Sequence, residues 1–419
     1  MNIVLPGLDT VREPYRALLT VGRTYAAFKP ATTIPLIERL RDHDTIADPM
    51  AGFGTLMNLC SQRGISTFNI EYNPPTYLWG FLNNPRNTPI IMDFIDHLLR
   101  LEVKFPEMQK KAEISDEWFT PTSLDAISHL YGLLSNLAPA TVNLTQRQDI
   151  ILALVIPFVG RLSCHVPGNI VANVKRGGIC FYRGLSDDFN RYLQVIKARL
   201  NAIDQISTNN NHEFLFGNLK TINPARRLSA FITSPPYPNS RDYYQMFAPE
   251  NNCLEYLKSK KIIVDLTVTE QLIGSVLVSK YADKNIDYHN QVSSESARTF
   301  IDRIATFEGR KRRSKYDNTV YYVPYFSNYF FNIEAAYRNF VRFLENRFEG
   351  YIVVVNNTAR NISIPVAQSI IELFHHMGIE AETVEEYTRE LSHVGSINPR
   401  VKGFKAKHME YTIKVWRRT

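Results

Sequence analysis

A strand followed by a glycine-rich turn near the N-terminus constrains the fold of this chain more than any other feature. Residues 45–47 have strand character, and residues 48–55 form a turn with two glycines that leads into a helix over residues 56–63. A second strand over residues 66–70 ends on Glu71. Strand, turn, helix and strand make a βαβ unit, and such units build parallel sheets with helices on their faces. The sequence therefore predicts an α/β protein with a Rossmann-like sheet.

The tip of the second strand indicates a nucleoside ligand. In dinucleotide-binding folds an acidic side chain at this place holds a ribose diol, and here Glu71 has that place, with Asn73 two residues on. A third glycine of the dinucleotide fingerprint would stand at position 57, which is Met57. We therefore expect a nucleoside ligand without a pyrophosphate rather than a nicotinamide cofactor.

A second turn follows the apolar run of residues 228–232. Pro235 and Pro236 fix two φ angles and remove two backbone donors, so the carbonyls of Ser234 and Pro235 are predicted to stay free to accept hydrogen bonds. Tyr237 adds an aromatic face. Rigid acceptors beside a ring suit a planar amine, such as an exocyclic base nitrogen. The alternative is a Pro-Pro turn in which Tyr237 only packs.

Composition limits the kind of protein further. The 419 residues carry a formal net charge of +7, which favours a polyanionic partner. The four cysteines form no C-x-x-C pair, so neither zinc nor a disulfide framework is indicated, and a cytoplasmic location fits. The start has no signal-peptide pattern, and the longest apolar stretch, residues 150–159, is interrupted by Pro157. We expect a soluble protein with no membrane partner.

These motifs resemble the AdoMet-dependent amino-methyltransferases of DNA, and within them the cytosine-N4 group that carries Ser-Pro-Pro-Tyr. Residues 48–55 resemble the family's Asp-Pro-Phe-x-Gly-x-Gly-Thr loop, with Met50 in place of Phe. The resemblance implies S-adenosyl-L-methionine as methyl donor and no metal. It implies catalysis by Ser234, Pro235, Pro236 and Tyr237. It implies cofactor binding by Phe28, Lys29, Pro30, Asp48, Gly52, Gly54, Thr55, Glu71, Asn73 and Asn218.

The activity implied by the resemblance is methyl transfer to cytosine N4 in double-stranded DNA by base flipping. The target amine would donate to Ser234 and to the proline-constrained carbonyl, without a covalent intermediate. The setting would be a restriction-modification or other host-marking system, with a cognate restriction endonuclease as a separate chain. Adenine-N6 methylation is the nearest alternative, methyl transfer to RNA is a third option, and a catalytically silent DNA-binding protein is a different class.

The order of strands and helices predicts the domain organisation. Seven strands begin near residues 45, 67, 213, 230, 351, 379 and 409, which predicts a doubly wound sheet ending in an antiparallel hairpin. With the resemblance, this is a seven-stranded class I AdoMet methyltransferase sheet. We expect a catalytic core of residues 1–75, 206–237 and 329–419, a helical insertion over 76–205 that includes a helix over 146–162, and a DNA-recognition insertion over 238–328. The catalytic core should include a helix over residues 329–347. The glycine turn and Ser-Pro-Pro-Tyr should meet at the switch point.

A cationic cluster lies in the second insertion. Its members are Arg310, Lys311, Arg312, Arg313 and Lys315, and Arg241 lies near the Ser-Pro-Pro-Tyr turn. We expect these side chains to contact DNA phosphates, although such a run is also typical of a solvated face.

Overall fold

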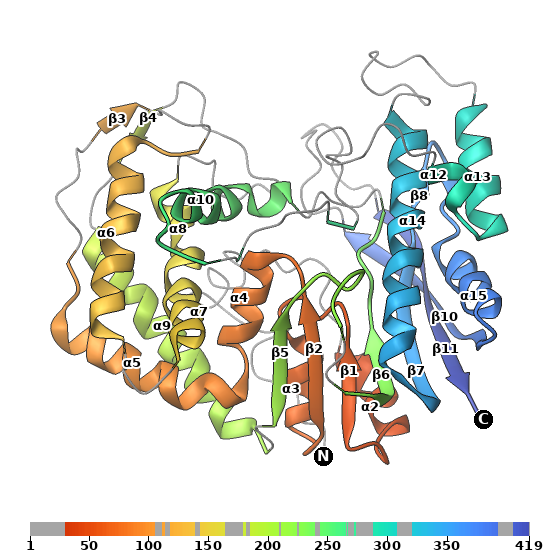
Figure 1. Ribbon diagram of the computed structural model, residues 1–419, viewed down its shortest axis with the longest axis horizontal. Helices are drawn as coiled ribbons and strands as arrows, with labels where there is room; N and C mark the ends of the chain where they lie inside the picture. The colour runs from red at the N-terminus through yellow and green to blue at the C-terminus, as the bar shows by residue number, and fades with distance from the viewer. Residues whose placement is uncertain are drawn as a thin grey trace.

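The computed structural model describes residues 30–104, 111–113, 118–138, 143–163, 179–181, 185–208, 211–223, 226–238, 244–264, 266, 272–273, 288–307, 321–392 and 405–418. Its centre is a seven-stranded sheet in the order β10-β11-β7-β6-β1-β2-β5 (Figure 1). The strands are β1 (Thr45–Asp48), β2 (Ser66–Glu71), β5 (His212–Phe216), β6 (Leu228–Thr233), β7 (Leu344–Asn356), β10 (Glu380–Ser392) and β11 (Lys405–Arg417).

The sheet is mostly parallel. Strands β1, β2, β5, β6 and β7 run in one direction, whereas β11 is antiparallel to both β7 and β10. The prediction of a mixed α/β protein with seven strands and a terminal antiparallel hairpin is therefore confirmed.

The strand order reverses between β1 and β6. From β1 the chain goes outward through β2 to β5, and from β6 it goes outward through β7 on the other side. The carboxyl ends of the five parallel strands lie at the upper edge of the sheet in Figure 1. Open α/β sheets bind ligands outside this edge, where the order reverses. The loops after β1 and β6 are therefore the places where this fold positions a site.

Helices cover both faces of the sheet at β1 and β6, and successive strand residues point to opposite faces. Ile46 and Ala230 pack with α2 and α3 on one face, and Ala47 and Phe231 pack in a cluster with α14 and α15 on the other. The bounds of these helices are α2 (Pro30–Arg39), α3 (Thr55–Ser61), α14 (Val323–Phe340) and α15 (Val366–His376). Neighbouring residues of β1 and β6 thus tie both helical layers to the switch point.

The predicted helical insertion is a bundle beside β5. Its elements are α4 (Pro74–Leu82), η1 (Pro85–Asn87), α5 (Thr88–Leu101), β3 (Lys111–Glu113), α6 (Pro121–Leu137), α7 (Leu144–Val155), η2 (Ile156–Phe158), α8 (Val159–Leu162), β4 (Ile179–Phe181) and α9 (Leu185–Ile206). The expected single helix over residues 146–162 is wrong in one respect. It changes to a 3₁₀ turn around Pro157, which has no backbone N–H to continue an α-helix.

The predicted helix over residues 329–347 is also wrong at its end. Helix α14 ends at Phe340, a 3₁₀ turn (η6, Val341–Phe343) follows, and β7 begins at Leu344. Leu344 pairs with Leu228 of β6, and an irregularity of register follows this pair. The polar residues after Leu344 resemble a helix surface, but they belong to a strand that pairs with β6 at Leu344 and again from Glu349 onward.

The described parts of residues 238–328 lie in two places. After η3 (Gln245–Phe247), α10 (Ala248–Ser259) packs into the core of the helical insertion. After α12 (Tyr288–Gln291), α13 (Glu295–Ala305) packs against α14 and α15 at the other side of the molecule (Figure 1). This range therefore contributes to two hydrophobic cores on opposite sides of the sheet edge.

Candidate functional site

The glycine turn after β1 has the backbone that its sequence requires. Gly52 and Gly54 have φ angles of +55° and +76°, in the left-handed region that favours glycine. The N–H of Gly54 donates to the Ala51 carbonyl at 3.0 Å, and the N–H of Ala51 donates to the Ile70 carbonyl at 2.9 Å. A Cβ at Gly54 would lie 2.8 Å from Met57 Cε, whereas a Cβ at Gly52 would meet no atom of the described residues within 4 Å. Neighbouring atoms therefore fill the space beside Gly54, whereas the space beside Gly52 is open among the described residues. Helix α3 begins at Thr55.

The carboxylate of Glu71 holds this turn to the tip of β2. Its Oε2 accepts from the Gly52 N–H at 2.8 Å, and its Oε1 accepts from the N–H groups of Tyr72 at 2.9 Å and Asn73 at 2.7 Å. Burial raises the pKa of Glu71, and the three N–H donors oppose that rise. A carboxylate has about four acceptor positions. Within the part of the chain that the structure describes, these bonds leave Glu71 one acceptor position, on Oε2.

Asp48 joins the two predicted motifs. It ends β1, is fully buried, and its Oδ1 accepts from Thr233 Oγ1 at 2.9 Å and from the Met50 N–H at 3.2 Å. Thr233 ends β6 and directly precedes Ser234. Among the described residues, Asp48 Oδ2 has no hydrogen-bond partner. Burial raises the pKa of Asp48 to about 7, and the neighbouring Glu71 adds a smaller rise.

The Ser-Pro-Pro-Tyr turn is fixed by side chains from distant elements. Ser234 Oγ and Tyr237 Oη are hydrogen-bonded at 2.9 Å. Tyr329 of α14 donates its hydroxyl to the Pro236 carbonyl at 2.9 Å, and Asn357, after β7, donates its Nδ2 to the Pro238 carbonyl at 3.0 Å. The turn leaves the sheet at β6 and is held between α14 and the end of β7.

The other two predicted residues at this edge have supporting contacts. Asn73 is buried at the N-cap of α4, and its N–H is one of the Glu71 donors. Asn218 follows Gly217, whose N–H donates to the Glu71 carbonyl at 3.0 Å. The Asn218 Oδ1 accepts from the Lys220 N–H at 3.0 Å, so one of its two acceptor positions is used within the loop.

The sequence did not indicate several residues at this edge. Tyr329 and Asn357 were not predicted as site residues, and their contacts arise from the packing of α14 and β7 on the turn. Tyr337 is buried, and its hydroxyl has no partner among the described residues. Burial raises its pKa well above the ordinary value, and the nearby Asp48 and Tyr237 add to the rise. The Tyr72 ring stacks on the Phe216 ring, with 5.8 Å between their centres. Tyr72 could have been noticed in the sequence because it directly follows Glu71.

Some predicted site residues lie outside the described residues. These are Phe28, Lys29, Arg241, Arg310, Lys311, Arg312, Arg313 and Lys315. The backbone of Pro30 begins α2, but its side chain is also outside.

The described residues give two further findings on the kind of site. They contain no group of three or more His, Cys, Asp or Glu side chains arranged to hold a metal ion. None of their helices combines the length and apolar character needed to cross a membrane.

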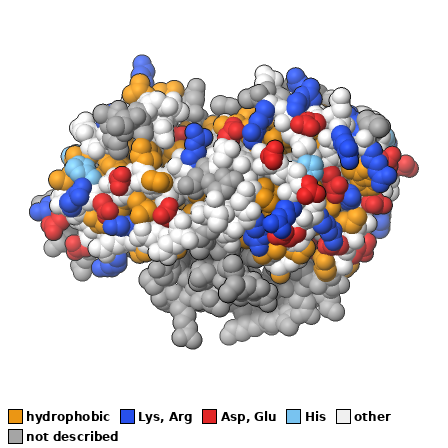
Figure 2. All heavy atoms as spheres, turned by 90° about the horizontal axis from the view of Figure 1, so that it is seen from below, with side chains coloured by type: hydrophobic (Ala, Val, Ile, Leu, Met, Phe, Trp, Pro, Cys, Tyr) orange, Lys and Arg blue, Asp and Glu red, His pale blue; other side chains and the backbone are white. Residues whose placement is uncertain are grey.

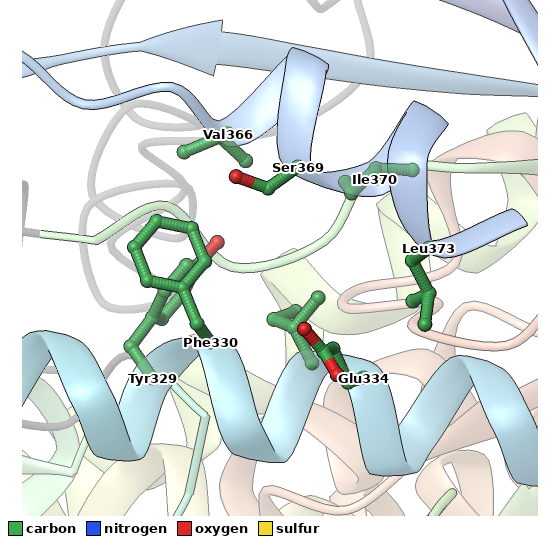
Figure 3. A pocket seen from close by; sticks show the side chains of 8 residues that line it. Tyr329, Phe330, Glu334, Val366, Ser369, Ile370 and Leu373 are labelled. Carbon is green, nitrogen blue, oxygen red and sulfur yellow. The ribbon is translucent and has the colours of Figure 1, made fainter. Parts of the chain in front are cut away.

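Two hollows lie away from the switch point. One of about 10 Å³ lies between α14 and α15, where Tyr329, Phe330 and Glu334 face Ser369 and Ile370 (Figure 3). It is large enough for about one water molecule. The other, of about 320 Å³, is open and is lined by residues of α13, β9 (Ile362–Ser363) and α15. Neither is lined by the residues of the two motifs.

Comparison with known proteins adds no family to this picture. Neither a scan of protein-family models, nor a search of curated proteins, nor a search of solved structures finds a match to this chain.

Proposed function

We propose that this protein is an AdoMet-dependent DNA methyltransferase that transfers a methyl group to cytosine N4. The observation that carries the proposal is the hydrogen bond between Thr233 Oγ1 and Asp48 Oδ1 at the switch point. It joins the turn that resembles an AdoMet loop to the turn that resembles a target-amine site. Transfer between two bound groups requires that their sites adjoin within a few ångströms.

The topology supports the finer assignment to class I AdoMet methyltransferases. Numbered in chain order, the seven strands lie in the order 6-7-5-4-1-2-3. Read from the other edge, the first five follow the doubly wound order 3-2-1-4-5. The antiparallel hairpin β10–β11 extends this order to the seven strands of the sheet that the resemblance implies.

The chain's own residues fit AdoMet. The open space at Gly52 admits a ligand close to the backbone, and Glu71 Oε2 has an acceptor position left for one ribose hydroxyl. The unpartnered Oδ2 of the buried Asp48 suits a cationic ligand, because a nearby positive charge favours the ionised carboxyl whose pKa burial has raised to about 7. When bound, AdoMet supplies an electrophilic methyl group on a positively charged sulfur.

The Ser-Pro-Pro-Tyr turn would position the target amine. Tyr237 offers a ring for stacking, and its hydroxyl fixes the Ser234 Oγ rotamer through their hydrogen bond. With Ser234 donating to Tyr237, the Ser234 oxygen keeps a lone pair to accept from the amine. Tyr329 holds the Pro236 carbonyl, so the turn is rigid before the base arrives. The amine proton leaves to solvent after transfer.

A serine at the first position of the turn favours cytosine N4 over adenine N6, where the resembling enzymes carry Asp or Asn. The experiment is methyl transfer from tritiated AdoMet to duplex DNA, followed by nucleoside analysis of the product. N4-methylcytosine is expected, with Ser234→Ala slower by about tenfold to a thousandfold in kcat. N6-methyladenine would replace the cytosine assignment, and no transfer to any DNA would contradict the proposal.

The setting in a restriction-modification or host-marking system, with a separate endonuclease, belongs to the same proposal. The test is to sequence DNA from cells that express the chain with a method that detects modified bases. A modified base confined to one short sequence is expected, because an endonuclease is blocked only by a mark at its own site.

A further inference from the structure

A short hairpin with a strained tip follows β7. Strands β8 (Thr358–Ala359) and β9 (Ile362–Ser363) pair antiparallel, and the two residues between them, Arg360 and Asn361, have φ angles of +52° and +63°. Two-residue hairpin tips with both φ angles positive favour Asn-Gly and similar pairs. An arginine in the first of these positions is unfavourable for the backbone. Strained non-glycine residues persist where surrounding structure holds them, and they are frequent at binding sites.

The hairpin is fixed beside the Ser-Pro-Pro-Tyr turn. It begins directly after Asn357, whose Nδ2 donates to the Pro238 carbonyl at 3.0 Å. The N–H of Ile364, on the far side of the hairpin, donates to the Asn357 carbonyl at 2.8 Å. Both ends of the hairpin are thus tied to one residue that holds the turn. In Figure 1, β8 lies at the carboxyl edge of the sheet, beside the start of α14.

An aromatic platform orients the Arg360 side chain. Its guanidinium lies 4.9 Å from the centre of the Tyr322 ring, and that ring stacks on Phe326 at an interplanar angle of 13°. Tyr321 and Tyr325 form a second stacked pair at 5°. Phe326 lies in α14, and this helix also carries Tyr329, whose hydroxyl donates to the Pro236 carbonyl. The platform therefore connects Arg360 to the turn through a single rigid element.

We propose that Arg360 binds a DNA phosphate next to the extruded target base. The proposal rests on the proposed function, because it needs a base in the Ser-Pro-Pro-Tyr turn. A guanidinium matches the two oxygens of a phosphate and stays charged at every physiological pH. Stacking on Tyr322 restricts its motion in advance, so less side-chain freedom is lost on binding. The hairpin that carries this cation lies at the carboxyl edge of the sheet, beside the turn that would receive the base.

The test compares three variants for binding to a mixed-sequence DNA duplex by fluorescence anisotropy at several salt concentrations. Arg360→Gly removes the cation and relieves the left-handed backbone. We expect Tm to stay level or rise, the Kd for duplex to increase about tenfold, and the slope of log K against log salt to shrink by about 0.9. A protein in which Arg360 only covers the platform would show an unchanged Kd and slope.

Two controls isolate the effect. Asn361→Gly relieves the same kind of backbone strain without changing charge, and it should leave Kd and slope unchanged. Arg41→Ala removes an exposed cation before β1, at the opposite edge of the sheet, where basic and acidic side chains are interspersed (Figure 2). It should also leave both unchanged. Equal effects of Arg360→Gly and Arg41→Ala on Kd and slope would mean that the loss of one positive charge at any position explains the change. That outcome would overturn the inference.

The outcomes separate this inference from the function beneath it. Duplex binding by the wild-type chain with an unchanged salt slope in Arg360→Gly overturns the inference alone. Absence of any salt-dependent duplex binding by the wild-type chain overturns the proposed function and the inference together.

Discussion

The two turns at the switch point are held in different ways. The turn of residues 48–55 is fixed by its own backbone and by Glu71 on the next strand in sequence. The turn of residues 234–238 is fixed by Tyr329 and Asn357, which come from α14 and the end of β7. The first turn is a local structure and the second is a product of tertiary packing. A change in the first should act on folding and cofactor binding together, whereas a change in the second should act on catalysis with little effect on cofactor binding.

Removal of the Glu71 carboxylate should give the largest effect. Glu71→Ala leaves three backbone N–H groups without their acceptor, and each buried unsatisfied donor costs about 1 to 3 kcal/mol. We expect a loss of at least about 3 kcal/mol in the free energy of unfolding, measured with urea, and loss of AdoMet binding, measured by calorimetry. Glu213→Ala is the matched control on the adjacent strand. Its carboxylate pairs with half-exposed Arg226 at 3.4 Å, so a loss below about 1 kcal/mol is expected.

The two glycines of the first turn should separate stability from binding. At Gly54, an alanine would be strained at φ +76° and would press on Met57, so Gly54→Ala should cost about 2 kcal/mol of unfolding free energy. At Gly52 only the backbone term applies, and Gly52→Ala should cost about 1 kcal/mol. Yet the methyl group added by Gly52→Ala would enter the open space, so this variant should lose more AdoMet affinity than Gly54→Ala. The same ranking in both measurements would show that the open space is not the ligand site.

The pH dependence should reveal Asp48. Its pKa is raised from about 3.8 to about 7 on folding, so the neutral carboxyl stabilises the folded state below pH 4, and this contribution is lost as the pH rises through 7. Unfolding free energy of the wild-type chain should fall relative to Asp48→Asn between pH 5 and pH 7, with a limiting slope of about 1.4 kcal/mol per pH unit. AdoMet should reverse the trend and release a proton on binding, measured by calorimetry in buffers of different ionisation enthalpy. Parallel stability curves for the two proteins would contradict a raised pKa of Asp48.

The second turn should respond to the loss of a single hydroxyl. Tyr329→Phe removes the donor to the Pro236 carbonyl, and we expect about 1 kcal/mol of lost stability, slower methyl transfer and unchanged AdoMet affinity. Tyr337→Phe is the matched control on the same helix. Its hydroxyl has no partner among the described residues, so stability should stay level or rise. Equal losses in both variants would mean that the hydrogen bond to the Pro236 carbonyl does not account for the loss.

This contrast also explains what could be predicted from the sequence. The βαβ unit was predicted because Gly52, Gly54 and the two apolar strands are adjacent in the chain and specify their own conformation. The junction of Asp48 with Thr233 followed from a rule of topology, since both end strands at the switch point. Tyr329, Tyr337 and Asn357 could not be found in this way, because their contacts depend on how α14 and β7 pack. For the same reason the end of the predicted helix at residue 347 was wrong: pairing with β6, rather than local preference, makes Leu344 the start of a strand.

The position of β6 between β1 and β7 has a consequence for synthesis of the chain. Strand β1 pairs with β2 soon after both leave the ribosome, but its other edge waits for β6, which follows the whole helical insertion. The hydrogen bond from Thr233 to Asp48 spans 185 positions, which take about 10 to 40 s to translate. During that time the nascent chain presents an unpaired strand edge to its neighbours, and an exposed edge is a template for aggregation. Slow translation and free chaperones should therefore decide the yield of this protein more than the stability of its finished sheet.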